Sequence, residues 1–176
     1  IYRYGEERAS RRIAKAIVKL RSEQTISTTK QLADIIEQVV PKKGRTHPAT
    51  KTFQALRIHV NDELGELEKV LADCPTLLAE KGRLVVVTFH SLEDRIVKQF
   101  LRDASGYNSG GSRHLPEVAV EGEPITFTLP KPHKIKPSND EIARNGRARS
   151  ATLRVGVKSC RTQSVSTEYL KETEKI

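Results

Sequence analysis

The feature that most constrains the fold is the segment at residues 82–95, where an apolar run leads directly into an amphipathic helix. Residues 84–89 form a short, continuous, β-branched apolar run, which is typical of a strand covered on both faces in a parallel sheet. Ser91 is a residue type that caps helices, and apolar residues then recur at helical spacing over 92–100. The segment therefore predicts a strand followed by a helix in an α/β domain.

Four polar side chains stand at this junction: His90, Ser91, Glu93 and Asp94. In open α/β sheets, ligands bind outside the carboxyl ends of the strands, so these residues occupy a favoured position for chemistry. A simpler interpretation is that Ser91 and Asp94 cap the helix, His90 bonds a neighbouring carbonyl, and Glu93 and Arg95 form a solvated first turn. The pattern alone leaves both interpretations open.

Length and composition limit the class of protein. A chain of 176 residues is large enough for one domain with a real core, with or without a subdomain. Cys74 and Cys160 show no metal-ligand spacing, so we expect reduced thiols and no metal site. No apolar run approaches the length of a membrane span and no signal-peptide pattern is present, which predicts a soluble cytoplasmic protein without membrane contact. The chain begins at Ile1 and contains no Met, so we interpret it as a fragment.

Positive charge is concentrated in two stretches, and the formal net charge is +9. The first stretch comprises Arg3, Arg8, Arg11, Arg12, Lys15, Lys19 and Arg21; the second comprises Lys131, Lys134, Lys136, Arg144, Arg147, Arg149, Arg154, Lys158 and Arg161. Such surfaces favour an anionic partner such as RNA, although solvated helix faces give the same pattern. Because aromatic residues make up only 5% of the chain, an extensive base-stacking platform is not expected.

The first 73 residues are predicted to be helical. One helix carries an apolar face that includes Ile13 and Ile17, and a second begins with the capping-box spacing at 28–31 and stops at Pro41. A third helix opens at Pro48, continues as one long amphipathic helix and ends at Pro75.

The α/β part follows the turn at residues 80–82. We expect a loop over 103–124, a short strand over 125–129 and a semi-extended basic connector over 130–137. A short helix capped by Ser138 ends at 145–146, and a half-buried strand at 151–158 alternates Leu153, Val155 and Val157 with other residue types.

Several segments together resemble one family, the bacterial ribosomal RNA small-subunit methyltransferase H (MraW) family. They are residues 4–8 (YGEER) with 11–14 (RRIA), 47–57 (HPATKTFQALR), 61–67 (NDELGEL), 82–95 (GRLVVVTFHSLEDR) and 147–154 (RARSATLR). Members of this family methylate the N4 amino group of a cytidine in 16S ribosomal RNA with S-adenosyl-L-methionine.

The resemblance implies a partial Rossmann-like class I methyltransferase sheet of α/β class, interrupted by an inserted all-helical subdomain. We expect the helical insert at 1–66, the carboxyl half of the sheet at 67–158 and a mobile polar tail at 159–176. The Gly-rich half that binds S-adenosyl-L-methionine in the family is not expected in this chain, because no G-x-G-x-x-G or close variant occurs in it. The residues that bind the cofactor therefore stay unknown, and we expect the chain alone to be inactive.

The resemblance also suggests roles for particular residues. His90 and Ser91 would line the pocket for the target base as catalytic residues, with Glu93, Asp94 and Arg95 fixing them and with Asn61 and Asp62 contacting substrate. The residues expected to contact RNA are Arg3, Arg8, Arg11, Arg12, His47, Arg57, Arg147 and Arg149. The expected partner is small-subunit ribosomal RNA or the small ribosomal subunit, and a homodimer is possible. The alternative is an RNA-binding module without catalysis, and helix packing or capping would equally explain Asn61, Asp62 and His47.

Overall fold

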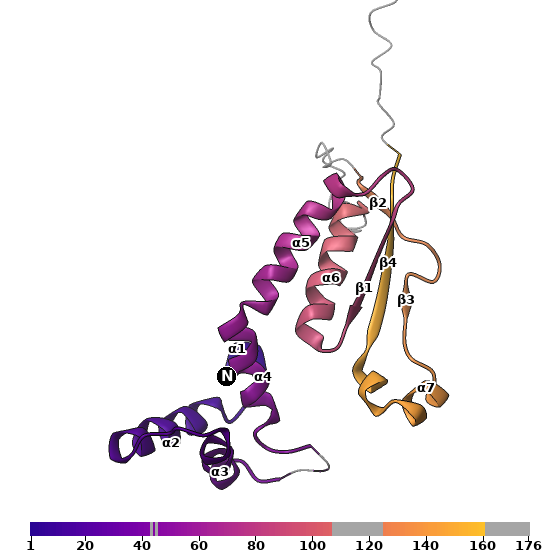
Figure 1. Ribbon diagram of the computed structural model, residues 1–176. Helices are drawn as coiled ribbons and strands as arrows, with labels where there is room; N and C mark the ends of the chain where they lie inside the picture. The colour runs from indigo at the N-terminus through magenta and orange to yellow at the C-terminus, as the bar shows by residue number, and fades with distance from the viewer. Residues whose placement is uncertain (43, 45, 107–124, 161–176) are drawn as a thin grey trace, which may run out of the picture. The chain divides into compact units, whose positions relative to one another are not determined.

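The computed structural model of the chain describes residues 1–42, 44, 46–106 and 125–160, which fall into two compact units (Figure 1). The first unit covers Ile1–Leu67 and the second begins at Glu68. Most of the predicted loop at 103–124 and the polar tail from 161 onward lie outside the described residues.

The first unit is helical, as predicted. It contains α1 (Tyr2–Gly5), α2 (Ser10–Glu23), α3 (Thr29–Val39) and α4 (Thr50–Asn61). Ile13 of α2 and Ile36 of α3 are fully buried and form a core with Ala49. The predicted capping box is confirmed: the Thr28 side chain accepts a hydrogen bond from the Gln31 N–H, and the Gln31 side chain accepts one from the Thr28 N–H.

The prediction of one long third helix is wrong. The helix begins at Thr50, two residues after Pro48, and is interrupted at Asp62, after which α5 (Glu63–Leu77) begins. Asp62 adopts the left-handed conformation with φ 49°, which aspartate tolerates better than most residues, so apolar spacing continues across a real break. Pro75 does not end the helix, because it lies in the last turn and removes only one hydrogen bond there.

The second unit combines helices with a small antiparallel sheet. Its elements are β1 (Arg83–Thr88), α6 (Ser91–Ala104), β2 (Phe127–Thr128), β3 (Lys134–Ile135), α7 (Asn139–Arg144), the 3-10 helix η1 (Gly146–Ser150) and β4 (Thr152–Lys158). The strand order is β1-β4-β2, and β3 also pairs with β4. Ser138 caps α7 by accepting a hydrogen bond from the Glu141 N–H, as predicted.

The expectation that β1 lies in a parallel sheet with both faces covered is wrong for the part of the chain that the structure describes. There β1 pairs only with β4, in antiparallel register, and α6 lies along one face of the two strands (Figure 1). Val85 and Val87 are 52% and 49% exposed on the other face. A continuous β-branched run therefore has one buried and one open side.

The inward side of β4 is also the reverse of the one that its apolar alternation indicates. Thr152, Arg154 and Gly156 are buried, whereas Leu153 and Val155 are only half-buried. The close approach of α6 explains this, because a Cβ at Gly156 would lie 2.7 Å from Leu101 Cδ2. The register pairs Val85 with Val155 and Val87 with Leu153, so these four side chains share what we call the open sheet face.

The two cysteines differ in environment, which gives a direct test of this fold. Cys74 is buried in α5, and burial, with a smaller contribution from Asp73, raises the pKa of its thiol; Cys160 is exposed. We expect iodoacetamide at pH 8 to alkylate Cys160 faster by about tenfold or more, because the thiolate is the reacting species. Peptide mass spectrometry measures both rates, which should converge in urea. Equal rates in native buffer would mean that the end of α5 does not stay folded.

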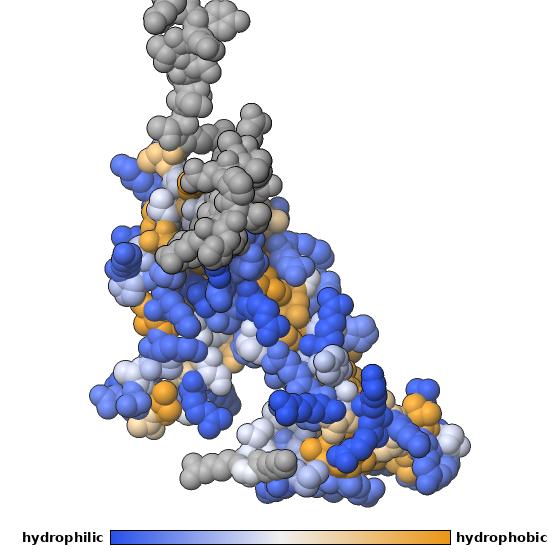
Figure 2. Space-filling model, turned by 180° about the vertical axis from the view of Figure 1, so that it is seen from behind, coloured by the Kyte–Doolittle hydropathy of each residue, from blue (hydrophilic) through white to orange (hydrophobic). Residues whose placement is uncertain are grey.

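Hydrophilic side chains predominate on the face drawn in Figure 2, interrupted by smaller hydrophobic areas. Among the helices that the structure describes, none has the length and apolar character required to cross a membrane.

Candidate functional site

The junction between β1 and α6 is organised by a histidine that caps the helix. His90, and not Ser91, is the N-cap residue: its ring Nδ1 accepts a hydrogen bond from the Glu93 N–H at 3.4 Å. Glu93 Oε2 in turn accepts hydrogen bonds from the Phe89 and His90 N–H groups, at 2.9 and 3.3 Å. Capping is thus a real function of this junction, but His90 and Glu93 perform it in place of the predicted Ser91 and Asp94.

This capping fixes the state of the His90 ring. Because Nδ1 acts as an acceptor, the proton of the neutral ring is on Nε2. Nε2 lies 3.3 Å from Glu93 Oε1 without hydrogen-bond geometry, and no described residue provides it with an acceptor. The side chain is 13% exposed, so a nearly buried donor is held in a defined orientation beside the end of a strand.

Asp94 is bound to Arg154 of β4, a partner that the sequence reasoning missed. Arg154 Nε and Nη2 donate to Asp94 Oδ1 and Oδ2 at 2.7 and 3.0 Å, and the Arg154 side chain is only 6% exposed. The hydrogen bond from Arg154 lowers the pKa of Asp94 against the opposing effect of burial, and the charges of Lys134 and Lys136 lower it further. The sequence did offer one signal for this contact: Arg154 is a charged residue between the apolar Leu153 and Val155 of a predicted strand.

The ion pair joins the first turn of α6 to the centre of β4, so Asp94 holds the helix on the sheet. Ser91 and Arg95 are exposed on the first turns of the same helix. The structure therefore places His90 and Glu93 as the ordered pair at the strand end, with Ser91 beside them.

The predicted residues at 57–62 make contacts within the first unit. Arg57 Nε and Nη2 donate to the two carboxylate oxygens of Glu63 at 2.7 and 3.0 Å, and Asn61 Nδ2 donates to Glu63 Oε1 at 3.2 Å. Asp62 forms the break between the helices. The charge of Arg57 is thus already matched by a carboxylate.

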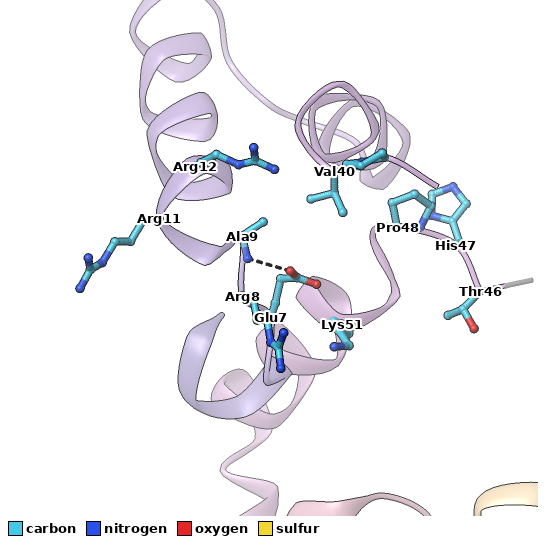
Figure 3. A pocket seen from close by; sticks show the side chains of 11 residues that line it. Glu7, Arg8, Ala9, Arg11, Arg12, Val40, Thr46, His47, Pro48 and Lys51 are labelled. Atoms are coloured by element: carbon cyan, nitrogen blue, oxygen red, sulfur yellow. Dashed lines mark hydrogen bonds between the residues drawn. The ribbon is translucent and has the colours of Figure 1, made fainter. Parts of the chain in front are cut away.

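Four of the predicted RNA-contacting residues come together around one cavity of about 520 Å³, which we call the cationic pocket (Figure 3). It lies between the start of α2, the end of α3 and the segment that leads into α4. Its lining consists of Glu7, Arg8, Ala9, Arg11, Arg12, Val40, Pro41, Thr46, His47, Pro48 and Lys51. Lys51 was missed, because a lysine on an exposed helix face carries no signal of its own. His47 Nε2 lies 2.8 Å from Glu37 Oε1, and its Nδ1 accepts a hydrogen bond from the Ala49 N–H.

The remaining predicted RNA contacts lie elsewhere. Arg3 stands over the Tyr4 ring at 5.4 Å from its centroid. Arg147 and Arg149 are exposed on η1 in the second unit.

Comparison with known proteins gives a consistent picture. The MraW methylase family matches residues 1–159. Proteins named ribosomal RNA small subunit methyltransferase H are similar to this chain: that of Beijerinckia indica is 58% identical over 90% of the chain and 44% of its own length. Those of Paramagnetospirillum magneticum and Rhodopseudomonas palustris are 52% and 57% identical, over 90% and 88% of the chain and 50% and 46% of their own lengths. The chain spans about half the length of these relatives. With a family match over nearly all of its described residues, the chain belongs to the MraW methylase family.

Proposed function

We propose that this chain forms part of an enzyme that methylates the N4 amino group of a cytidine in small-subunit ribosomal RNA. Family membership and the printed names of the relatives support a ribosomal RNA methyltransferase. The N4 amine is a weak nucleophile because its lone pair is delocalised into the ring, so its orientation matters more than a strong base. The target base must also leave its stack to reach a pocket.

The observation that carries the proposal is the His90 Nε2–H, a buried donor that has no hydrogen-bond partner among the described residues and that a bound base would satisfy. Cytosine presents two acceptors, N3 and O2, on the same edge as its N4 amine. A fixed Nε2–H donor hydrogen bonds one of them and thereby orients the amine, while Glu93 holds the imidazole through the capping contacts. The exposed Ser91 hydroxyl follows His90 in the chain and accepts a hydrogen bond from the N4 amino group. Both residues act by positioning the base.

Methyltransferases of this family use S-adenosyl-L-methionine, which supplies an electrophilic methyl group on a positively charged sulfonium. Two cavities of the described residues do not fit this group. The cationic pocket is rich in arginine, and a second cavity of about 300 Å³ is lined by Lys98, Arg102 and Arg154 among others. Such linings repel a sulfonium. We therefore place the methyl-donor site mainly in family sequence outside this chain.

The open sheet face also supports a role for family sequence outside this chain. Val85 and Val87 are about half exposed, and the edge of β1 opposite β4 has no strand partner among the described residues. An unpaired edge next to an apolar face is normally covered. Because the relatives are about twice as long, we propose that their additional sequence provides this cover.

The test uses a full-length family enzyme in which the segment matching residues 1–159 is replaced by this chain's sequence. His90→Asn keeps a good N-cap acceptor but removes the Nε2 donor, so the fold is retained. We expect methyl transfer to small-subunit ribosomal RNA to slow by about tenfold or more, the worth of one well-placed hydrogen bond. The unchanged chimera should methylate cytidine N4, as identified by mass spectrometry of the nucleosides. A loss below about threefold would contradict the role of His90, and methylation at another atom would contradict the proposed reaction.

A second candidate is an RNA-binding module without catalysis, which the cationic pocket favours. Calorimetric titration of S-adenosyl-L-methionine into the 176-residue chain shows whether the chain alone can bind the methyl donor or acts only as an RNA-binding module. We expect no binding. Saturable one-to-one binding would show that this chain holds the donor site itself, and would contradict our placement of that site.

A further inference from the structure

We propose that the cationic pocket binds one unpaired nucleotide of the RNA, with the phosphate against Arg8 and Lys51 and the sugar and base against an apolar wall. This inference rests on the proposed function for the presence of an RNA substrate. It goes further by assigning a subsite in the helical unit and the conformation of RNA that the subsite accepts.

The charges of the pocket are available to a ligand. No described residue hydrogen bonds or pairs with Arg8, which is exposed. Lys51 Nζ donates to the Glu6 carbonyl oxygen at 3.1 Å, and Arg12 Nη2 donates to the Val39 carbonyl oxygen at 3.0 Å. Carbonyl oxygens orient these groups without cancelling their charge. The pocket thus holds oriented cations, which suits a phosphate.

The pocket also has an apolar part, which a phosphate alone would not need. Val40, Pro41 and Pro48 form an apolar part of the lining, and Pro48 is buried. In Figure 3, Arg8, Glu7 and Lys51 gather at one end, and Arg12 extends toward Val40. A cavity of about 520 Å³ that combines an apolar wall with a few charged groups has the size and character of a small-molecule site. A nucleotide has both components, an anionic phosphate and a flat, largely apolar base.

The same geometry discriminates against duplex RNA. A base that is stacked in a duplex presents only its edge, so it lies against the apolar wall only after it leaves its stack, and RNA is recognised in this way mainly in single-stranded loops and ends. Among the described residues that line the pocket, Glu7 is the one carboxylate, and its Oε1 already accepts a hydrogen bond from the Ala9 N–H at 2.8 Å. Its charge offsets part of the positive charge of Arg8 and Lys51 (Figure 3), which disfavours a second phosphate, and its carboxylate accepts a hydrogen bond from an amino or imino group of a base. The pocket therefore suits one nucleotide, not a stretch of backbone.

The test measures binding by the whole 176-residue chain, without a methyl donor. The probes are a fluorescein-labelled single-stranded hexacytidine RNA, the same strand in a duplex, and cytidine 5′-monophosphate. The variants are Arg8→Gln and Val40→Thr, with Arg21→Gln as the control, since Arg21 is also exposed but lies in the last turn of α2, outside the pocket. Circular dichroism verifies that each variant is folded.

We expect Arg8→Gln to weaken binding of the hexanucleotide about tenfold and to reduce the salt slope by about 0.7, the value for one phosphate contact on a single strand. Val40→Thr should weaken binding about threefold with an unchanged slope, because it makes the wall polar. Arg21→Gln should stay within about twofold of the unchanged chain. The duplex and the mononucleotide should bind more weakly than the hexanucleotide.

The proposal fails if Arg8→Gln and Arg21→Gln have equal effects, if Val40→Thr has none, or if the duplex binds as tightly as the single strand. Equal affinity for the mononucleotide would indicate a site for free nucleotides and would also overturn it. Because these measurements need no methyl donor, they are independent of the methylation assay. If the pocket binds RNA as expected but the chimera does not methylate cytidine, only the proposed reaction is contradicted. If the chimera methylates cytidine but the pocket variants do not behave as expected, only the pocket proposal is contradicted.

Discussion

Replacing Asp94 by asparagine is expected to lower the free energy of unfolding of the second unit by about 3 kcal/mol. The substitution leaves Arg154, whose side chain is only 6% exposed, without its counter-charge. Removing one partner of a buried ion pair costs more than removing both, since an uncompensated charge remains. The double variant Asp94→Leu, Arg154→Met should therefore recover part of the loss. Hydrogen exchange of the β4 amides in increasing urea measures this stability directly.

The control is Asp73→Asn, an exposed acidic residue on α5, which should change stability by less than about 0.5 kcal/mol. The contribution of Asp94 also depends on pH. Because Arg154 lowers the pKa of Asp94 in the folded state below the ordinary value of 3.8, the stabilisation is complete above that value. It is lost as pH falls through the folded-state pKa, so the difference between the unchanged chain and Asp94→Asn should disappear in strong acid. A difference that does not depend on pH would contradict the ion pair as its source.

Replacing Gly5 by alanine is expected to destabilise the first unit by about 2 kcal/mol. A Cβ at Gly5 would lie 2.5 Å from the Lys51 carbonyl oxygen and 3.4 Å from Ala55 Cβ. The closer atom belongs to the backbone of α4 and cannot rotate aside, so α1 must move away from α4. Hydrogen exchange of the α4 amides measures the loss.

Gly146→Ala is the matched control, because nothing lies within 4 Å of a Cβ at that position. Its effect should stay below about 0.5 kcal/mol. If the two alanine variants were equally stable relative to the unchanged chain, α1 would not pack on α4 as closely as described. Since Lys51 also lines the cationic pocket, Gly5→Ala should weaken RNA binding as well.

Local signals in the sequence predicted local structure well. The capping box at Thr28 and Gln31 and the cap at Ser138 depend on side chains within three residues of each other, and both are confirmed. The break at Asp62 was not predictable from apolar spacing, because helical periodicity continues on both sides of it. A single residue in the left-handed conformation ends one helix and starts the next without disturbing the pattern.

Long-range contacts were the harder part. Apolar alternation predicted a half-buried strand at β4 but did not reveal that Arg154 and Gly156 face inward, because this depends on the pairing of Arg154 with Asp94, 60 residues away, and on the close approach at Gly156. For the candidate site, the sequence located the junction at residues 90–95 but assigned the cap to Ser91. Histidine is an uncommon N-cap, so residue preference favoured the neighbouring serine. Whether His90 acts on a base stays a prediction.

The antiparallel pairing of β1 with β4 also has a consequence for folding during synthesis. Thr88 and its partner Thr152 are 64 residues apart, whereas the first unit is complete at Leu67. At about 5 to 20 residues per second, β1 waits roughly 3 to 13 seconds for its partner strand after it has been made. During that interval the helical unit can already fold, whereas the valines of β1 have no paired strand and α6 has no complete sheet to pack on. The period in which β1 is at greatest risk of aggregation therefore lies between the synthesis of Thr88 and that of Thr152.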